Sequence, residues 1–152
     1  MDQSKLIAEN RKARHDYHIL GRVEAGIALA GTEVKSLRAG KASLADSYAA
    51  IEGREAFLHN LHISPYDPAS RFNHDPRRKR KLLLHRSEIR RLRAQTDEKG
   101  CTLVPLKLYF NADGRAKVEL AVARGKRAHD RRDTLSEREA RREIERAMKE
   151  RR

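Results

Sequence analysis

The chain has 152 residues and a formal net charge of +13, with 38% hydrophobic and 38% charged side chains. This length fits one ordinary domain with a single core. No apolar run approaches the length of a membrane span, and residues 1–14 lack the hydrophobic core of a secretory signal. The single Cys101 excludes an internal disulfide and has no metal-ligand spacing around it, so we expect a reducing cytoplasm, no metal and no cofactor.

The excess positive charge lies in two segments. Residues 71–93 carry 10 basic and 2 acidic side chains, residues 124–152 carry 12 and 7, and the rest of the chain is balanced. A solvated charged face is the ordinary explanation of a charge run. Because the whole surplus is concentrated in this way, a polyanionic partner fits better. Nucleic acid is favoured over an anionic membrane, since neither segment has a broad apolar face.

Residues 17–29 alternate as a half-buried strand does, with apolar side chains at odd positions. Gly21 and Gly26 interrupt this strand, and glycine inside a strand commonly marks a bulge or a bend that curls a sheet. The period then changes to that of a short helix, which we expect Thr32 to cap and Gly40 to end.

Two pairs of strands are expected after this helix, at 47–52 with 55–63 and at 103–110 with 115–123. Gly53 suits a type II′ turn in the first pair, and Pro105 places its strand at an edge or bulge. A long basic loop over 64–80 and a helix over 85–98, ended by Gly100, separate the pairs. The expected inward side chains are Phe57, Leu61, Ile63, Leu84, Ile89, Leu92, Val104, Leu106, Leu108, Phe110, Val118, Leu120 and Val122.

Residues 17–123 therefore predict a mainly β domain with short helices. Five strands with bulge signals and two inserted helices are typical of a small closed antiparallel barrel of the oligonucleotide-binding type, which presents a curved polar face to nucleic acid. Residues 1–16 show no sustained period and are expected to be a mobile polar arm. Residues 124–152 combine capping boxes with a thin apolar stripe, so we expect a basic tail that is disordered when free and helical when bound.

No catalytic residues are predicted. His15, Asp16 and His18 could be drawn as a proton-transfer cluster, but Glu24, on the strand face of His18, stands about 20 Å along the strand. The sequence contains no phosphate-binding loop, zinc motif or serine elbow. From the residues alone, two interpretations stay open. One is a general RNA chaperone that binds through its basic segments, and the other is an RNA-processing enzyme that uses His15, Asp16 and His18.

Four strings closely resemble the SsrA-binding protein family, also called small protein B. They are ARHDY (13–17), EAGIALAGTEVKSLRAGKASLADSYA (24–49), RKLLLHRSEI (80–89) and VARGKRAHDRR (122–132), in collinear order. The resemblance implies a barrel that binds the tRNA-like domain of transfer-messenger RNA, and a tail that enters the messenger channel of the small ribosomal subunit. The protein would be a non-enzymatic adaptor in the rescue of stalled ribosomes, and nothing in its sequence indicates an obligate oligomer.

The resemblance also implies functional residues. The family's RNA-contacting positions match Asn10, Glu24, Leu84 and Lys117. Lys35, Arg38 and Lys41 are further RNA-binding candidates, with an ordinary solvated helix as the alternative. By alternation Glu24 and Lys117 face outward, whereas Leu84 could equally belong to the core and Asn10 could be a cap.

In the tail, the resemblance implies contacts with the ribosomal decoding centre. The matching residues are Gly125, Lys126, Arg127, His129, Asp130, Arg131 and Arg132. An imidazole in this segment could stack on a ribosomal base, and its arginines could bind phosphates. Some relatives carry an aromatic residue in the tail helix, whereas this chain has Ala140 near that place.

Overall fold

Strands dominate the computed structural model, which describes residues 4–66, 73–97 and 100–125 together with 142 and 146. In chain order the elements are β1 (Lys5–Glu9), α1 (Arg11–Asp16), β2 (Tyr17–Ile27), α2 (Gly31–Arg38), β3 (Ala42–Ser43), β4 (Tyr48–Glu52), β5 (Glu55–His59), β6 (His62–Ile63), β7 (Arg80–Leu83), α3 (Arg86–Thr96), β8 (Cys101–Phe110) and β9 (Ala116–Gly125). The expected tail lies outside the described residues, apart from its first two positions and residues 142 and 146.

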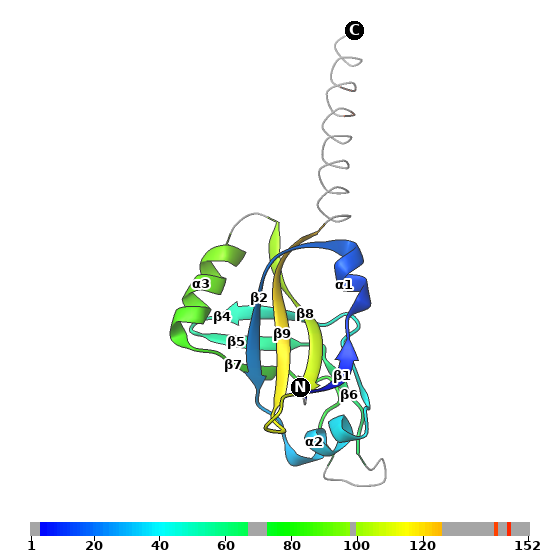
Figure 1. The fold of residues 1–152 in the computed structure, drawn as a ribbon. Coiled ribbons are helices and arrows are strands. Elements are labelled where there is room, and N and C mark those ends of the chain that lie inside the picture. The colour runs from blue at the N-terminus through cyan, green and yellow to red at the C-terminus, as the bar shows by residue number, and fades with distance from the viewer. Residues whose placement is uncertain (1–3, 67–72, 98–99, 126–141, 143–145, 147–152) are drawn as a thin grey trace.

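The strand pairings close into a ring, as Figure 1 shows. The order is β1-β8-β4-β5-β7-β2-β9, all pairs are antiparallel, and β9 pairs again with β8 along its length. Strands β3 and β6 form a separate short pair. The main core lies inside this ring, where Leu58, Leu108 and Leu120 are fully buried. The expectation of a mainly β chain with short helices is confirmed. Among the described residues, no helix is long and apolar enough to cross a membrane.

Two of the expected strand interruptions are bulges. The register of β2 against β9 shifts between Ile19 and Gly21, and that of β8 against β9 shifts between Pro105 and Lys107. A bulge adds one residue to a strand and changes which face the following side chains occupy. This is why Val104 and Leu106 pack with Ala13 in a second small cluster, whereas Leu103, Leu108 and Phe110 pack in the main core. The expectation that 104, 106, 108 and 110 share one face is wrong.

Gly26 has a different role from the expected bend. Its register with β9 is continuous, and a Cβ at this position would lie 3.1 Å from Cβ of Leu83. That distance is shorter than ordinary van der Waals contact, so the bare backbone of Gly26 is what lets Leu83 lie against β2.

The hairpin of β4 and β5 forms as expected, with Gly53 at φ +64, which suits the first central residue of a type II′ turn. The expected second strand is divided, however, because Asn60 adopts φ +63. Side chains at even positions, such as Leu58, are buried before this residue, and Leu61 and Ile63 are buried after it. Phe57 is only half-buried, so the expectation that it shares the inward face is wrong.

The expectation of a mobile arm is wrong for residues 5–16, which form β1 and α1. Strand β1 pairs with β8 from Lys5 opposite Phe110 to Glu9 opposite Lys107. Its side chains are exposed or half-buried. Only the neighbours Ile7 and Ala8 pack against the main core, so the strand shows no hydrophobic alternation in the sequence.

The helix ends differ from the expected ones in two places. Helix α2 begins two residues earlier, after the N-cap Ala30, whose N–H donates to the Glu33 carboxylate at 2.8 Å. The expected cap Thr32 instead bonds Nδ1 of His74 at 3.0 Å. Helix α3 ends at Thr96 and not near 98. Gly40 follows α2 with the expected positive φ of +73.

Candidate nucleic-acid interface

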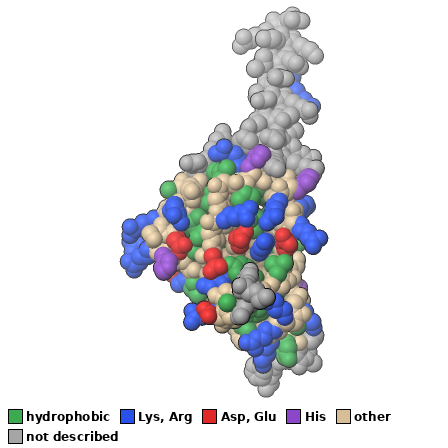
Figure 2. Space-filling view, viewed as in Figure 1, with side chains coloured by type: hydrophobic (Ala, Val, Ile, Leu, Met, Phe, Trp, Pro, Cys, Tyr) green, Lys and Arg blue, Asp and Glu red, His purple; other side chains and the backbone are tan. Residues whose placement is uncertain are grey.

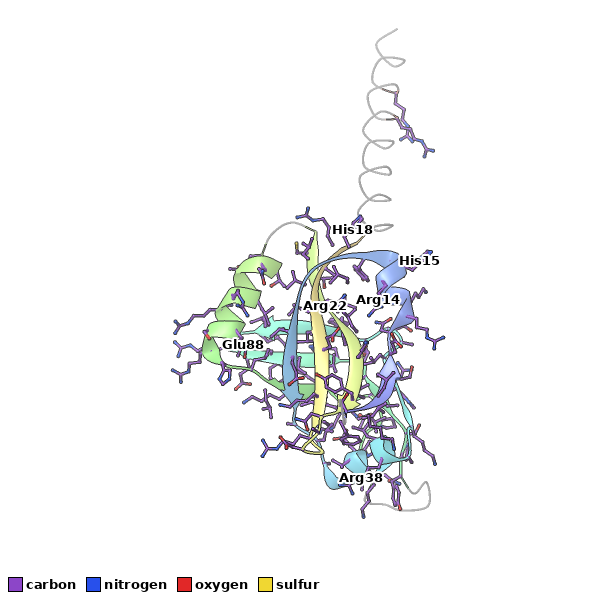
Figure 3. The ribbon with its side chains drawn as sticks, in the orientation of Figure 1. Arg14, His15, His18, Arg22, Arg38 and Glu88 are labelled. Carbon is purple, nitrogen blue, oxygen red and sulfur yellow. The ribbon has the colours of Figure 1, made fainter. Side chains whose placement is uncertain are left out.

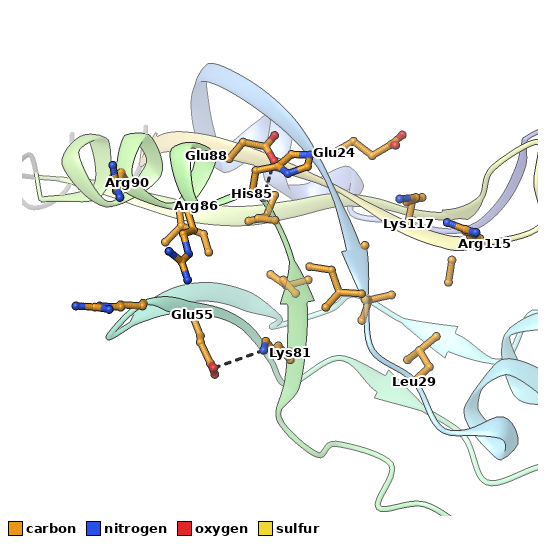
Figure 4. A pocket seen from close by; sticks show the side chains of 18 of the residues that line it. Glu24, Leu29, Glu55, Lys81, His85, Arg86, Glu88, Arg90, Arg115 and Lys117 are labelled. Atoms are coloured by element: carbon orange, nitrogen blue, oxygen red, sulfur yellow. Dashed lines mark hydrogen bonds and ion pairs between the residues drawn. The ribbon is translucent and has the colours of Figure 1, made fainter.

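An open groove of about 1340 Å³ lies between α3 on one side and β2 with the β8–β9 turn on the other, with β7 between them (Figure 4). Its apolar lining includes Leu29, Leu83, Leu84 and Ile89. Its basic lining is Arg54, Lys81, Arg86, Arg90, Arg93, Arg115 and Lys117, and its carboxylates are Glu24, Glu55 and Glu88. Seven cations against three carboxylates make the groove electropositive, which attracts a polyanion.

Three residues that the resemblance assigned to RNA contact line this groove, although they are far apart in the sequence. Glu24 comes from β2, Leu84 follows β7, and Lys117 lies on β9 opposite Gly26 of β2. Glu24 is exposed and Lys117 half-exposed, as the alternation predicted. The fold therefore brings these three side chains together along one surface.

The Glu24 carboxylate is held by a residue that the sequence analysis missed. The hydroxyl of Tyr109, on β8, donates a hydrogen bond to it. Glu24 also borders a smaller neighbouring groove of about 400 Å³, which Lys107, Tyr109 and Glu119 line as well. Tyr109 stands opposite Lys117 in the β8–β9 register. Its sequence signal was its outward position in an alternating strand, which alone does not identify a partner.

The more exposed leucine of the groove is Leu83 and not Leu84. Leu83 is 52% exposed, whereas Leu84 is half-buried and packs against the main core. Both line the groove. Leu84 therefore belongs to both places: it packs against the core and also lines the groove.

Most cations of the basic run of residues 77–81 pair with carboxylates of the same chain. Arg78 and Arg80 each pair with Glu33 at 2.5 Å, Lys79 pairs with Glu52 at 2.9 Å, and Lys81 pairs with Glu55 at 3.4 Å. Four of its five cations thus have a carboxylate partner, and Arg78 and Arg80 share the single carboxylate of Glu33. Lys79 also lies over the Phe57 ring, 4.1 Å from its centroid.

Arg80 and Glu33 are both fully buried. The Arg80 guanidinium donates to Glu33, to the carbonyl of Leu61 at 2.6 Å, and to three carbonyls of its own loop, those of Asp75, Pro76 and Arg78. Burial raises the pKa of Glu33, but hydrogen bonds from Arg78, the Ala30 amide and Arg80 outweigh it, so the pKa lies below its ordinary value. This pair ties the basic loop to α2.

The other predicted RNA contacts lie outside the groove. Asn10 is the N-cap of α1: its side chain accepts from the Ala13 amide at 3.2 Å and donates to the Pro105 carbonyl at 3.1 Å. Lys35, Arg38 and Lys41 are exposed on or just after α2, and Figure 3 shows Arg38 at the end of the molecule that α2 occupies.

The predicted contacts of the tail are nearly all outside the described residues. Gly125 is buried at the end of β9, opposite Tyr17 of β2. Positions 126–132, and the Ala140 position, are not described.

The histidines of the alternative enzyme hypothesis do not form an acid–base set with Glu24. Nδ1 of His15 lies 3.2 Å from the Asp16 carboxylate on an exposed surface. His18 lies opposite Arg124, near the start of β2, at the end of the strand remote from Glu24 (Figure 3). In the described part of the chain, no three His, Cys, Asp or Glu side chains are grouped as metal ligands.

The comparisons with known proteins agree on one family. A family model described as SmpB protein matches residues 7–150. The SsrA-binding protein of Pelotomaculum thermopropionicum is 60% identical over 147 residues, which cover 97% of this chain and 95% of that protein. That of Thermobifida fusca is 62% identical over 148 residues, covering 97% and 92%. A solved structure described as "tmRNA-SmpB: a journey to the center of the bacterial ribosome" aligns with a TM-score of 0.67 and 62% identity, over 79% of this chain and 84% of that one. The chain therefore belongs to the SmpB protein family.

Proposed function

We propose that this protein is an RNA-binding adaptor that binds the tRNA-like domain of transfer-messenger RNA and delivers it to stalled ribosomes, where the nascent peptide is tagged for degradation. The observation that carries the proposal is the convergence of Glu24, Leu84 and Lys117 on one electropositive groove. The names of its relatives, SsrA-binding protein and a tmRNA–SmpB complex of the bacterial ribosome, support the same assignment.

The groove supplies the three kinds of contact that structured RNA requires. Its cations bind phosphates and provide most of the affinity, with a strong salt dependence. The Glu24 carboxylate accepts hydrogen bonds from base amino groups or ribose hydroxyls, which carry specificity and distinguish RNA from DNA. The exposed face of Leu83 offers an apolar surface to an unstacked base.

The proposal also includes the type of fold, the location of the protein, its oligomeric state and the contacts of its tail. The ring of antiparallel strands is assigned as a closed barrel of the oligonucleotide-binding type. The protein acts as a cytoplasmic monomer without catalytic residues or a cofactor. Residues 125–132 contact the decoding centre, and the remainder of the 124–152 tail occupies the messenger channel.

The test is to recover tagged protein from its own cells through a moderate-salt wash and to sequence the bound RNA. Glu24→Ala is compared with Glu9→Ala, which removes an exposed carboxylate on β1, outside the groove. We expect one dominant RNA with a tRNA-like acceptor end, retained by Glu9→Ala and reduced in Glu24→Ala. A broad mixture that neither variant changes would contradict the proposal and favour a general RNA-binding protein.

A further inference from the structure

We propose that the arginines on the groove side of α3, namely Arg86, Arg90 and Arg93, bind the phosphate backbone of the RNA whose bases meet Glu24. The RNA then lies between two walls of the groove. The β2 wall, with Glu24, contacts its bases, and the α3 wall binds its phosphates. This inference rests on the proposed function. The sequence pattern pointed to a polyanion for the whole of residues 71–93, and the structure singles out the three arginines of this stretch that face the groove.

The spacing of these arginines directs them into the groove. Positions 86, 90 and 93 are separated by four and three residues, which places them on one face of a helix, along about 10 Å of its axis. All three line the groove, whereas Arg91 of the same helix does not. Figure 4 shows Arg86 reaching from α3 into the space above β5 and β7, across from Lys117 and Arg115. Basic side chains also gather over the α3 edge of the molecule in Figure 2.

The charge of this wall is not neutralised by its neighbours. Within the described residues, Arg86 and Arg90 make no ion pair. Of the nearby carboxylates, Glu88 accepts from the His85 amide at 2.9 Å and Glu55 pairs with Lys81 at 3.4 Å. A guanidinium that faces a concave surface without an internal partner keeps its full capacity for bidentate contact with a phosphate.

The wall is also anchored to the fold. Arg93 donates to the carbonyl of Gly53 at 3.0 Å, which bridges α3 to the β4–β5 turn. Leu92 packs α3 into the main core, and the Glu88 carboxylate holds the helix start. Because the helix is fixed, binding costs less ordering of the protein than it would on a free loop.

Leu83 lies between the two walls. It is 52% exposed and lies against Gly26, where no Cβ intervenes. Its narrow apolar surface suits one unstacked base. It does not suit a membrane, for which a broad apolar face would be needed. The combination of a hydrogen-bond acceptor at Glu24, an apolar floor and a row of arginines favours RNA over an acidic protein segment, because RNA offers base amino and ribose hydroxyl donors to the carboxylate as well as phosphates to the arginines.

The test measures binding of the full chain to the RNA recovered with it, over a range of salt concentrations. The double variant Arg86→Ala/Arg90→Ala is compared with Arg11→Ala/Arg91→Ala, which removes the same charge from exposed positions outside the groove. We expect the groove variant to weaken binding by roughly tenfold for each lost contact, and to reduce the salt slope by about 0.7–0.9 per contact. The control should stay within about twofold, and both variants should keep the wild-type Tm, since these side chains are exposed.

The outcomes separate this inference from the proposed function. If wild-type protein binds the recovered RNA no better than an unrelated RNA of equal length, the proposed function fails. If wild type is selective but the two double variants lose affinity equally, the α3 wall is wrong and the proposed function stands. Loss of affinity in the groove variant without a change of salt slope also overturns the inference, because phosphate contacts must release counterions.

Discussion

Two neighbouring arginine-rich segments of this chain differ in what their charge does. Residues 77–81 and the arginines of α3 look alike in the sequence, and both belong to the most basic stretch of the domain. In the fold, four cations of the first segment pair with carboxylates, whereas Arg86 and Arg90 face the groove without an ion pair among the described residues. The comparison teaches that the position of the carboxylates, and not the density of arginines, decides which basic segment is left for a polyanion.

The buried member of the first segment explains why that charge is structural. An unpaired guanidinium in a protein interior would cost several kcal/mol, so Arg80 is found there only with Glu33 and four carbonyl oxygens around it. Because those carbonyls belong to Leu61 and to residues 75–78, the side chain holds the loop on α2. Its role is to shape the basic loop and not to bind a ligand.

The largest effect is expected from Arg80→Ala. Removing one partner of a buried pair leaves the Glu33 carboxylate with only Arg78 and the Ala30 amide, and leaves the loop carbonyls without their donor, so we expect the free energy of unfolding to fall by about 3–5 kcal/mol. Urea denaturation followed by circular dichroism measures it. The control Arg77→Ala removes an exposed arginine of the same run and should change stability by less than about 0.5 kcal/mol. Equal urea midpoints for Arg80→Ala and Arg77→Ala would show that the charge of Arg80 is not structural.

A smaller effect is expected from acid, through the same carboxylate. The pKa of Glu33 is lowered from 4.5, because hydrogen bonds from Arg78, Ala30 and Arg80 outweigh the opposing effect of burial. A group whose folded-state pKa is depressed stabilises the protein above its unfolded pKa and loses that contribution as pH falls through the folded value. The stability difference between wild type and Glu33→Gln should therefore be constant near neutral pH and shrink below pH 4.5.

Urea denaturation of both proteins from pH 7 to pH 3 tests this. The pKa of Glu52 is also lowered, by hydrogen bonds from Lys79 and His59, but this group is present in both proteins and cancels in the difference. A difference that does not change with pH would mean that the Glu33 carboxylate is not what holds the two arginines.

The strands of this fold were predictable where one face is buried and the other exposed. Alternation identified β2 and the outward positions of Glu24 and Lys117 correctly, because side-chain direction in a strand is a local property. It failed beyond Asn60, which has a positive φ, and across the bulges at Gly21 and Pro105, where an extra residue changes the face of those that follow. Tyr17 and Ile19 therefore pack with the second cluster, and Val23 with the main core. It also failed for β1, where the two side chains that pack against the core, Ile7 and Ala8, are adjacent and do not alternate.

The groove was not predictable from the sequence, because its walls meet only in the folded chain. The partner of Arg80 is 47 residues away, and charge counting assigned that arginine to a basic surface. Three groove residues came from the family resemblance, which supplies positions without the contacts that explain them. The role of Tyr109 required the fold, and so did the distinction between the α3 arginines and the paired residues 77–81, since both depend on what lies opposite in space.

The smallest effect is expected from Lys79→Ala. This variant tests whether a cation of residues 77–81 that pairs with a carboxylate contributes to RNA binding. Lys79 pairs with Glu52 and covers the Phe57 ring, and both sides of the ion pair are nearly half-exposed. An exposed ion pair with a cation–π contact contributes about 0.5–1 kcal/mol, so stability should fall by no more than that. Because the lysine lies outside the groove, RNA affinity and its salt slope should match those of wild type. Arg90→Ala removes the same charge and should weaken binding by roughly tenfold. If Lys79→Ala weakened binding as much as Arg90→Ala, pairing with a carboxylate would not separate structural from RNA-binding charge in this molecule.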